Sequence, residues 1–446
     1  MTLTDTLVNF SLGSLAPTAR ARAIVRLSLL DWAAVTHAGS SEPVAKHVRT
    51  YALHNGGRAE STLVGSNLKL PAATAALVNG TTSHALDYDD THFDYIGHPS
   101  VTVIPAVLAV GESIGASDAA CLDAALVGLE VATRVGVWLG RSHYSSGFHI
   151  TATAGSVGAT AAAARLLDLT PVQAGHALSL VASRASGLRA QFGSMAKPWQ
   201  AGLAASNGVE AALLAKLGVE ASTNVIEAPQ GLAATQRGEF NGHAFDNLGT
   251  AYRFEEVTHK FHACCHGTHA MIDALRSVKA ERPIDPDTVR KVTVTVTPQF
   301  ENVCNQLTPQ TGLEAKFSFR LLAAMTLHAH DTASLDSYSA AVCVDPKLTS
   351  LRDRVDTLFD PSMPETAAKV RIDTPDGVHV GEADLLDPTF LADTGAREAR
   401  VLAKAASLLG TDLTNYLCAC VDSAEQATGS LAARLLSTRA VDRETS

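Results

Sequence analysis

The chain has 446 residues, of which 46% are hydrophobic and 18% are charged, and its formal net charge at pH 7 is −10. This length allows roughly two or three domains with a sizeable core, and the composition is that of a globular protein. The acidic balance, with no run of five or more Lys and Arg residues, argues against a nucleic-acid-binding protein. No apolar stretch reaches about eighteen residues without a polar interruption, so we expect no membrane span.

The cysteines and the N-terminus both bear on the compartment. Residues 1–7 lack the basic segment and apolar core of a signal peptide. Seven cysteines are spaced irregularly along the chain, which suits reduced thiols better than a disulfide framework. We therefore expect a cytoplasmic protein. The cysteines are Cys121, Cys264, Cys265, Cys304, Cys343, Cys418 and Cys420.

The chain from residue 17 to about residue 260 reads as successive helices. Apolar residues recur at helical spacing, and prolines stand at several positions where a helix could begin. The abundance of Ala and Gly in these segments favours closely packed helices in a bundle. The predicted segments are 17–34, 71–78, 105–114, 119–139, 151–167, 171–188 and 202–217.

The pattern changes after about residue 285. Residues Lys291–Thr297 alternate apolar and polar side chains, which predicts a half-buried strand. A second alternation at 369–373 runs through Thr374-Pro-Asp-Gly377 into 378–380, which predicts a hairpin. Helical patterns fall between and after these strands, at 315–330, 334–342 and 394–436.

These patterns predict a mainly α protein with a smaller α+β domain. A large all-helical bundle domain would be formed by both chain ends, residues 1–268 and 396–446. An α+β domain, residues 269–395, would be inserted between them.

Residues 84–100 concentrate groups that exchange protons, between two apolar, helix-like runs. Such groups on a rigid scaffold are typical of acid/base catalysis, and a solvated acidic turn is the alternative interpretation. The groups are His84, Asp87, Asp89, Asp90, His92, Asp94 and His98.

Two further segments carry candidate catalytic groups. His149 directly precedes a predicted helix, whose dipole would lower the pKa of the imidazole and leave it a neutral base. Lys197 stands alone in a small, apolar stretch before another predicted helix, where it could hold a carboxylate or act as a base. Tyr144 lies in a polar loop that could bind a carboxylate. Each of these residues could instead be an ordinary polar group at a helix end or loop.

The histidines and cysteines of residues 262–269 suggest a metal site, but their spacing is poor for zinc. His269 opens a predicted helix and is a better acid/base candidate. Residues 87–94 lack the Gly and Glu of a calcium loop. Gly111-Glu-Ser-Ile-Gly115 matches a nucleophile-elbow pattern but follows a helix-like run rather than a strand, so we predict a helix end there. Nucleotide-binding motifs are absent from the sequence.

Five motifs, in this order, resemble those of the MmgE/PrpD family, and the resemblance covers nearly the whole chain. They are His-Ala-Leu-Asp-Tyr-Asp-Asp (84–90), His-Pro-Ser (98–100), Phe-His (148–149), Ala-Lys-Pro (196–198) with Ala-Gly-Leu-Ala-Ala (201–205), and Thr-His-Ala-Met-Ile-Asp-Ala (268–274). The resemblance implies a homodimer whose active site lies between the two domains and needs no metal and no cofactor. One residue more than in the family separates Asp87 from His98.

The resemblance also implies roles for individual residues. By motif, Asp87, His98, His149 and Lys197 are the acid/base groups and His269 binds substrate. Tyr144 and Arg320 could add to the field that stabilises developing negative charge. Tyr144 completes the predicted catalytic set, and Arg320 completes the predicted substrate-binding set.

Members of this family include 2-methylcitrate dehydratase, cis-aconitate decarboxylase and iminodisuccinate epimerase. The first two of these members share a tyrosine at the position where this chain has Leu321. This difference favours a cofactor-independent epimerase that acts on a small anionic polycarboxylate similar to iminodisuccinate. The alternatives are a hydro-lyase acting on 2-methylcitrate or citrate, a decarboxylase, and a non-catalytic dimer that binds an anionic metabolite.

Overall fold

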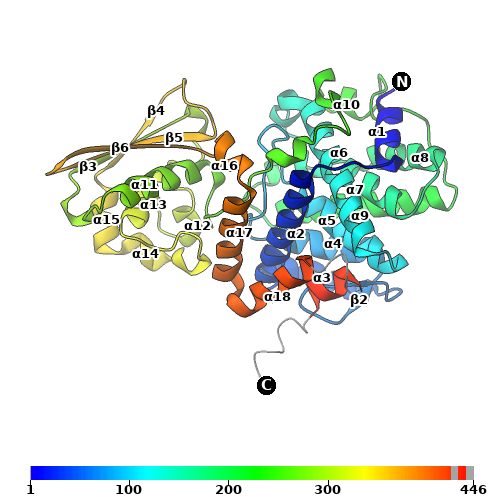
Figure 1. Ribbon diagram of the computed structural model, residues 1–446, viewed down its shortest axis with the longest axis horizontal. Helices are drawn as coiled ribbons and strands as arrows, with labels where there is room; N and C mark the ends of the chain where they lie inside the picture. Colours follow the sequence, from blue (N-terminus) through cyan, green and yellow to red (C-terminus); the bar gives the residue numbers. More distant parts are fainter. Residues whose placement is uncertain (1, 423–429, 438–446) are drawn as a thin grey trace. The chain divides into compact units, whose positions relative to one another are not determined.

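The computed structural model describes residues 2–422 and 430–437 (Figure 1). The described chain is mainly helical with a small mixed sheet, as predicted. It divides into two compact units: the first runs up to His259 and resumes at Leu409, and the second runs from Lys260 to Leu408. Among the described helices, none is both long enough and apolar enough to cross a bilayer.

The first unit is built from helices, together with one pair of two-residue strands that the sequence did not predict. Strand β1 (Ser61–Thr62) pairs antiparallel with β2 (Lys69–Leu70). The helices are α1 (Leu3–Leu12), α2 (Ala19–Gly39), α3 (Pro43–Asn55), α4 (Ala72–Ser83), α5 (Ser100–Ile114), α6 (Asp118–Ser145), α7 (Ile150–Leu166), α8 (Pro171–Ala182), α9 (Ala196–Lys216), α10 (Leu232–Thr235), α18 (Thr411–Asp422) and α19 (Leu431–Leu436).

Several helix boundaries differ from the prediction, and helices α1 and α3 were not predicted. Pro105 lies inside α5, which already begins at Ser100. Helix α8 ends at Ala182 rather than near residue 188. Helix α6 continues past residue 139 through a kink at Gly140, whose φ of 72° is open to glycine. The predicted helix end at 111–115 is confirmed, because Gly115 takes the left-handed conformation that stops α5.

The second unit is a four-stranded sheet with helices packed on it. The strand order is β4-β3-β5-β6, with β3 and β4 parallel and the other pairs antiparallel. Helices α11 and α13 pack against the sheet (Figure 1). The strands are β3 (Lys291–Val296), β4 (Val355–Phe359), β5 (Ala367–Thr374) and β6 (Gly377–Asp384); the helices are α11 (His269–Glu281), α12 (Gly312–Ala315), α13 (Phe319–Leu327), α14 (Ala340–Val344), α15 (Pro346–Arg352), α16 (Pro388–Ala392) and α17 (Thr394–Leu409).

The hairpin predicted around Thr374 and Gly377 is confirmed as the β5–β6 turn. Strand β4 was not predicted. The helix predicted over 334–342 is wrong in part, because a 3-10 turn at Leu335–Ser337 precedes the short α14.

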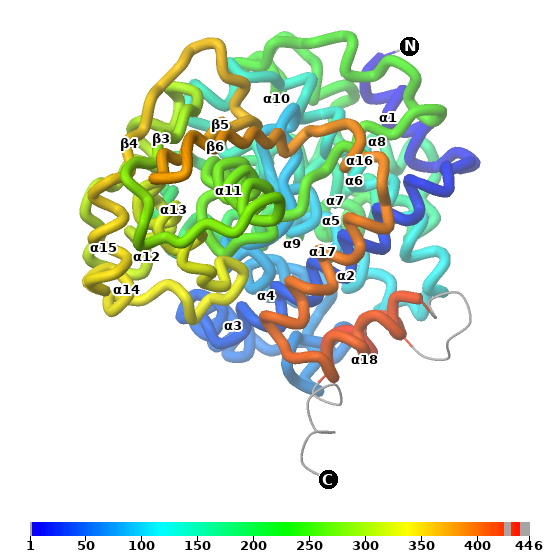
Figure 2. The backbone as a smooth tube through the Cα atoms, turned by 60° about the vertical axis from the view of Figure 1, so that its left-hand side comes forward, coloured from blue at the N-terminus to red at the C-terminus, as the bar shows by residue number. Residues whose placement is uncertain are grey.

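Both chain ends contribute to the first unit. Helices α18 and α19 pack against α2, and α19 also packs against α5. His37 Nε2 lies 2.7 Å from the Leu435 carbonyl oxygen, and the Gly65 N–H donates to the Leu436 carbonyl at 2.8 Å. Figure 2 shows α18 close to α2, which lies almost four hundred positions earlier in the chain.

Helices α4 and α9 approach closely because glycines face each other. A Cβ atom on Gly202 would lie 2.3 Å from the Leu77 carbonyl oxygen, and one on Gly80 would lie 2.9 Å from the Gly202 Cα. Helix α7 packs against both α5 and α9. These contacts place the end of α4 and the starts of α7 and α9 within one layer of tightly packed helices.

We predict that Gly202→Ala lowers the free energy of unfolding by roughly 1–3 kcal/mol, because the added methyl group overpacks the α4–α9 contact. Gly175→Ala is the control, since a Cβ there meets no atom within 4 Å on a helix of the same unit. It should raise stability by up to about 1 kcal/mol through helix propensity. Urea unfolding followed by circular dichroism measures both. If the two variants changed the free energy of unfolding equally, the close contact between α4 and α9 would not contribute to stability.

Candidate active site

The loop that joins α4 to α5 carries the first candidate residues. His84 caps the end of α4, and Pro99 precedes α5. Asp87 has a φ of 50°, in the left-handed region that non-glycine residues rarely occupy. Such backbone strain is concentrated at functional sites.

Two other polar residues of this loop hold its backbone in place. Thr91 exchanges backbone hydrogen bonds with Thr258 at 2.8 and 2.7 Å. His92 Nε2 lies 2.9 Å from the Arg253 carbonyl oxygen. His92 therefore has a structural role.

The buried Asp89 carboxylate lies between two imidazole rings. Its Oδ1 accepts a hydrogen bond from His84 Nδ1 at 2.8 Å. Its Oδ2 lies 2.8 Å from His98 Nδ1, whose proton points to the Asp90 carbonyl oxygen at 2.9 Å. Burial alone would raise the pKa of Asp89, but the two histidines lower it well below its usual value. Asp89 is therefore a carboxylate that orients both rings.

His98 is a buried, neutral imidazole. Burial lowers its pKa to about 4, against the opposing effect of Asp89 and with further lowering by His84 and Lys197. Its Nε2 lies 3.6 Å from Asp87 Oδ1.

Lys197 forms an ion pair with Asp87, in which Nζ lies 2.7 Å from Oδ1. The lysine lies in the first turn of α9, not before the helix as predicted. The Asp87 side chain is 45% exposed and that of Lys197 is 14% exposed. The ion pair therefore lies between the buried histidines and solvent. The carboxylate of an anionic ligand could take the place of the Asp87 carboxylate at Lys197.

His149 directly precedes α7, and its Nδ1 lies 2.9 Å from Gln200 Oε1. The Leu188 backbone fixes the Gln200 amide, because its N–H donates to Oε1 at 3.1 Å and its carbonyl accepts from Nε2 at 3.3 Å. A Cβ on Gly187 would lie 2.9 Å from the same Oε1, so glycine is required there. The pKa of His149 lies well below its usual value because of burial first and Lys197 second. The lowered pKa was expected, but burial and Lys197 cause it rather than the helix dipole.

The structure thus brings together four of the predicted residues: Asp87, His98, His149 and Lys197. His84 links the two halves of the group, since its ring centroid lies 4.6 Å from that of His98 and 6.3 Å from that of His149. Neutral imidazoles beside an ammonium group can exchange protons with a bound anion and stabilise its charge.

Tyr144 is not among these contacts. The Arg189 guanidinium lies 3.8 Å from the centre of its ring, and Arg189 Nη1 donates to the Tyr144 carbonyl oxygen at 3.0 Å. Tyr144 is therefore stacked against Arg189, in the part of α6 that follows the kink at Gly140.

The two predicted substrate-binding residues belong to the second unit. His269 opens α11, as predicted, and is buried beside His262 and His266, with ring centroids at 4.9 and 4.8 Å. Burial and then these two rings lower the pKa of His269 well below its usual value. Arg320 Nη2 lies 3.9 Å from Asp356 Oδ1.

The suspected metal motif at 262–269 is part of a hydrogen-bonded network. His262 Nδ1 lies 2.7 Å from Thr332 Oγ1, and its Nε2 lies 3.2 Å from Asp273 Oδ1. Arg400 donates two hydrogen bonds to the same Asp273 carboxylate, at 2.9 and 3.0 Å. Both ring nitrogens of His262 are therefore engaged.

A second group could in principle hold a metal, since His84, Asp87, Asp89 and His98 each offer a ligand atom within 4.8 Å of the others. Asp89 already lies at hydrogen-bond distance from both Nδ1 atoms, which leaves no room for an ion between carboxylate and rings. The Lys197 ammonium supplies the positive charge at Asp87. The donor set fits an acid/base cluster better than a metal site.

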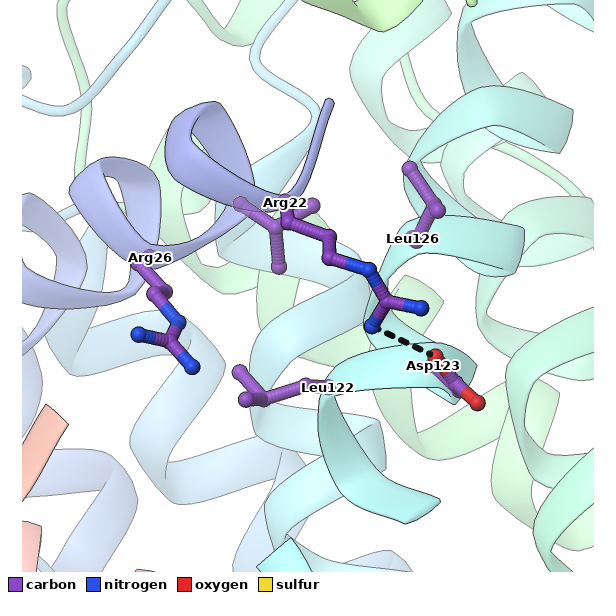
Figure 3. Close-up of a pocket in the computed structure, with 6 residues that line it drawn as sticks. Arg22, Arg26, Leu122, Asp123 and Leu126 are labelled. Atoms are coloured by element: carbon purple, nitrogen blue, oxygen red, sulfur yellow. Dashed lines mark ion pairs between the residues drawn. The ribbon is translucent and has the colours of Figure 1, made fainter. Parts of the chain in front are cut away.

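Figure 3 shows a small hollow between α2 and α6 that does not suit a polycarboxylate. Its volume is about 20 Å³, which is space for roughly one water molecule. Arg22 Nη1 lies 3.8 Å from Asp123 Oδ1 across it. This ion pair connects the two helices.

Neither Gln200 nor the pairing of Asp89 with His84 was predicted from the sequence. Gln200 follows Lys197 by three positions, so one helical turn places both side chains on the same face of α9. That spacing was the available signal for Gln200. The pairing of Asp89 with His84 depends on how the loop turns, which no spacing rule reveals.

Asp90 lies behind His98 in the protein interior. Its carboxylate accepts hydrogen bonds from the hydroxyl and the N–H of Ser100. Burial raises the pKa of Asp90 to about 7, and the nearby Asp31 and Asp89 charges add to this effect.

We predict that Asp90→Asn becomes more stable relative to wild type as pH rises. An acid with a raised folded-state pKa contributes stability that is present below the unfolded-state pKa, 3.8, and is lost as pH rises to about 7. Asparagine does not titrate. Between pH 5 and 8 the difference in unfolding free energy should move by on the order of 2 kcal/mol in favour of the variant. Urea unfolding at both pH values measures it, and a constant difference would contradict the raised pKa.

Comparison with known proteins identifies the family of the chain. Residues 2–241 match the MmgE/PrpD N-terminal domain, and residues 262–414 match the MmgE/PrpD C-terminal domain. Human cis-aconitate decarboxylase is 28% identical over 349 residues, which cover 75% of this chain and 71% of that protein. Cis-aconitate decarboxylase of Aspergillus terreus is 30% identical over 236 residues, or 50% of this chain and 48% of that protein.

A cis-aconitate decarboxylase-like protein of Aspergillus oryzae is 30% identical over 283 residues, which cover 58% of each chain. The chain thus spans about half the length of the fungal relatives. The two domain matches together extend over most of its own length and include every residue of the cluster around Lys197. The chain belongs to the MmgE/PrpD family.

Proposed function

We propose that this protein is a cofactor-independent lyase that decarboxylates a small, unsaturated polycarboxylate of the cis-aconitate type. One observation carries the proposal: the Lys197–Asp87 ion pair lies beside the neutral imidazoles of His98 and His149. The names of the relatives favour this decarboxylase alternative over the epimerase interpretation of the sequence. We also expect a homodimer, as the family resemblance implies.

Substrate binding would begin at the exposed side of the ion pair. A substrate carboxylate competes with Asp87 for the Lys197 ammonium, which makes a charge-assisted hydrogen bond to either. The buried histidines around the ammonium exclude water, so its charge acts on the ligand with little screening.

The chemical step needs a proton donor and a stabilised anion. When the C–CO₂ bond breaks, its electron pair forms a new double bond, and the electron pair of the old double bond takes a proton onto carbon. The Lys197 ammonium is the donor in this proposal, and CO₂ leaves. A proton from solvent then restores the ammonium by way of Asp87, the exposed member of the pair.

An epimerase is the second candidate, favoured by the apolar side chain at position 321. Leu321 is fully buried in α13, so this position offers no phenol for acid catalysis. An epimerase removes a proton next to a carboxylate and returns one to the opposite face. His149 and Lys197 would then be the two groups.

We predict that Lys197→Ala loses at least about a hundredfold in kcat/KM, because it removes the proton donor and the positive charge together. The fold should persist, since the side chain reaches solvent through Asp87. Lys46→Ala is the matched control: Lys46 is exposed on α3, outside the cluster. If Lys197→Ala kept near-full activity, Lys197 would have no place in the mechanism.

The reaction class is tested by incubating the protein in D₂O with cis-aconitate, 2-methylcitrate, citrate and iminodisuccinate, followed by proton NMR. We expect release of CO₂ from cis-aconitate and a product with one carboxylate fewer, with deuterium on one carbon. Exchange at the α-carbon of iminodisuccinate without CO₂ would establish the epimerase instead. A new alkene from a hydroxy acid would establish the hydro-lyase.

A further inference from the structure

Two ring nitrogens of the cluster have no partner within the described structure. His84 Nε2 and His149 Nε2 are both buried and accept or donate no hydrogen bond. His98 Nε2 lies 3.6 Å from Asp87 Oδ1, which is beyond hydrogen-bond distance. A buried polar atom without a partner is destabilising, so the Nε2 atoms of His84 and His149 point to a ligand that satisfies them.

The opposite nitrogen of each ring determines where its proton lies. Nδ1 faces an acceptor in all three rings: Asp89 Oδ1 at 2.8 Å, the Asp90 carbonyl at 2.9 Å and Gln200 Oε1 at 2.9 Å. An acceptor cannot bond to a lone pair, so each Nδ1 carries a proton. Whenever one of these rings is neutral, its Nε2 is then a lone pair.

Asp89 is the positioning residue for two of these rings. One carboxylate lies 2.8 Å from the Nδ1 atoms of both His84 and His98, and it is fully buried. It therefore sets the tautomer of His84, and its negative charge lies beside the His98 Nδ1–H, whose proton faces the Asp90 carbonyl oxygen. In both rings, Nε2 is directed away from Asp89.

Such a set of lone pairs conflicts with a fully ionised ligand. Carboxylate oxygens are acceptors only, and so are the Nε2 atoms of neutral imidazoles. Lys197 supplies donors at one end of the cluster. At the other end, around His84, a carboxylate needs a proton between itself and the ring.

We propose that His84, positioned by Asp89, is a further catalytic residue of this site, and that a polycarboxylate binds together with a proton held at His84 Nε2. This proposal rests on the proposed function for its ligand class. A proton there neutralises repulsion between the ligand and the lone pair. The titratable groups that surround His84 are Asp89, His98, His149 and, beyond them, Asp87 and Lys197.

The first test needs no ligand. The ¹⁵N NMR signals of labelled histidine distinguish the two neutral tautomers from the cation, and His84→Asn assigns the His84 pair. We expect the Nδ1–H tautomer at pH 8. In Asp89→Asn, the amide NH₂ donates to one Nδ1, so one ring should change to the Nε2–H tautomer. An Nε2–H tautomer of His84 in the wild type, or unchanged tautomers in Asp89→Asn, would overturn the proposal.

The second test measures proton uptake with propane-1,2,3-tricarboxylate, which has no double bond and cannot be decarboxylated by the proposed route. Uptake of one proton weakens Kd about tenfold for each pH unit. For the wild type, titration calorimetry between pH 7 and 8.5 should show log Kd rising by at least one per pH unit. In His84→Asn this slope should be smaller, by up to one per pH unit, because the proton at His84 is no longer taken up. His54→Asn, at an exposed position of α3, is the control and should match the wild type.

The outcomes separate the two proposals. Equal slopes in wild type and His84→Asn, with cis-aconitate still decarboxylated, would overturn the role of His84 alone. A wild-type protein that neither binds the tricarboxylate nor converts any substrate of the panel would overturn the ligand class and, with it, both proposals. Should His84→Asn fail to fold, Asp89→Asn and His84→Gln carry the same comparison.

Discussion

The candidate site depends on the close approach of α4 and α9. Gly80 and Gly202 let the two helix backbones come within the distance that a single methyl group would occupy. Helix α7 packs on the same layer, so His84, His149 and Lys197 lie together although they come from three separate helix ends. The chemistry of the site is therefore a consequence of helix packing, and small residues in the core decide it.

Burial then determines the electrostatics of the cluster. Imidazoles removed from water and placed near an ammonium lose their protons more easily, and the pKa values of His98 and His149 are lowered for this reason. Asp89 resists the same effect because two rings stabilise its charge. The site thus combines one buried carboxylate, neutral bases and a lysine that reaches solvent, which is a useful set for moving protons onto and off a small anion.

Much of this could be predicted from the sequence, and the limits have physical causes. The density of His and Asp in residues 84–100 identified the loop, and His149 and Lys197 stood out as polar groups at predicted helix ends. The role of Asp89 and Gln200 depends on which side chains meet across the packed helices, which local spacing does not encode. Strand β4 and the true end of α8 were missed because tertiary contacts override weak local patterns there.

The return of the chain to α2 has a consequence for how the protein is made. Helices α18 and α19 complete the packing of α2 and α5, and the Arg434–Asp118 ion pair joins α19 to the first residue of α6. During synthesis, residues 260–408 must leave the ribosome before these helices exist, a delay on the order of ten seconds. In that interval the nascent first unit exposes the surface of α2 that α18 later covers.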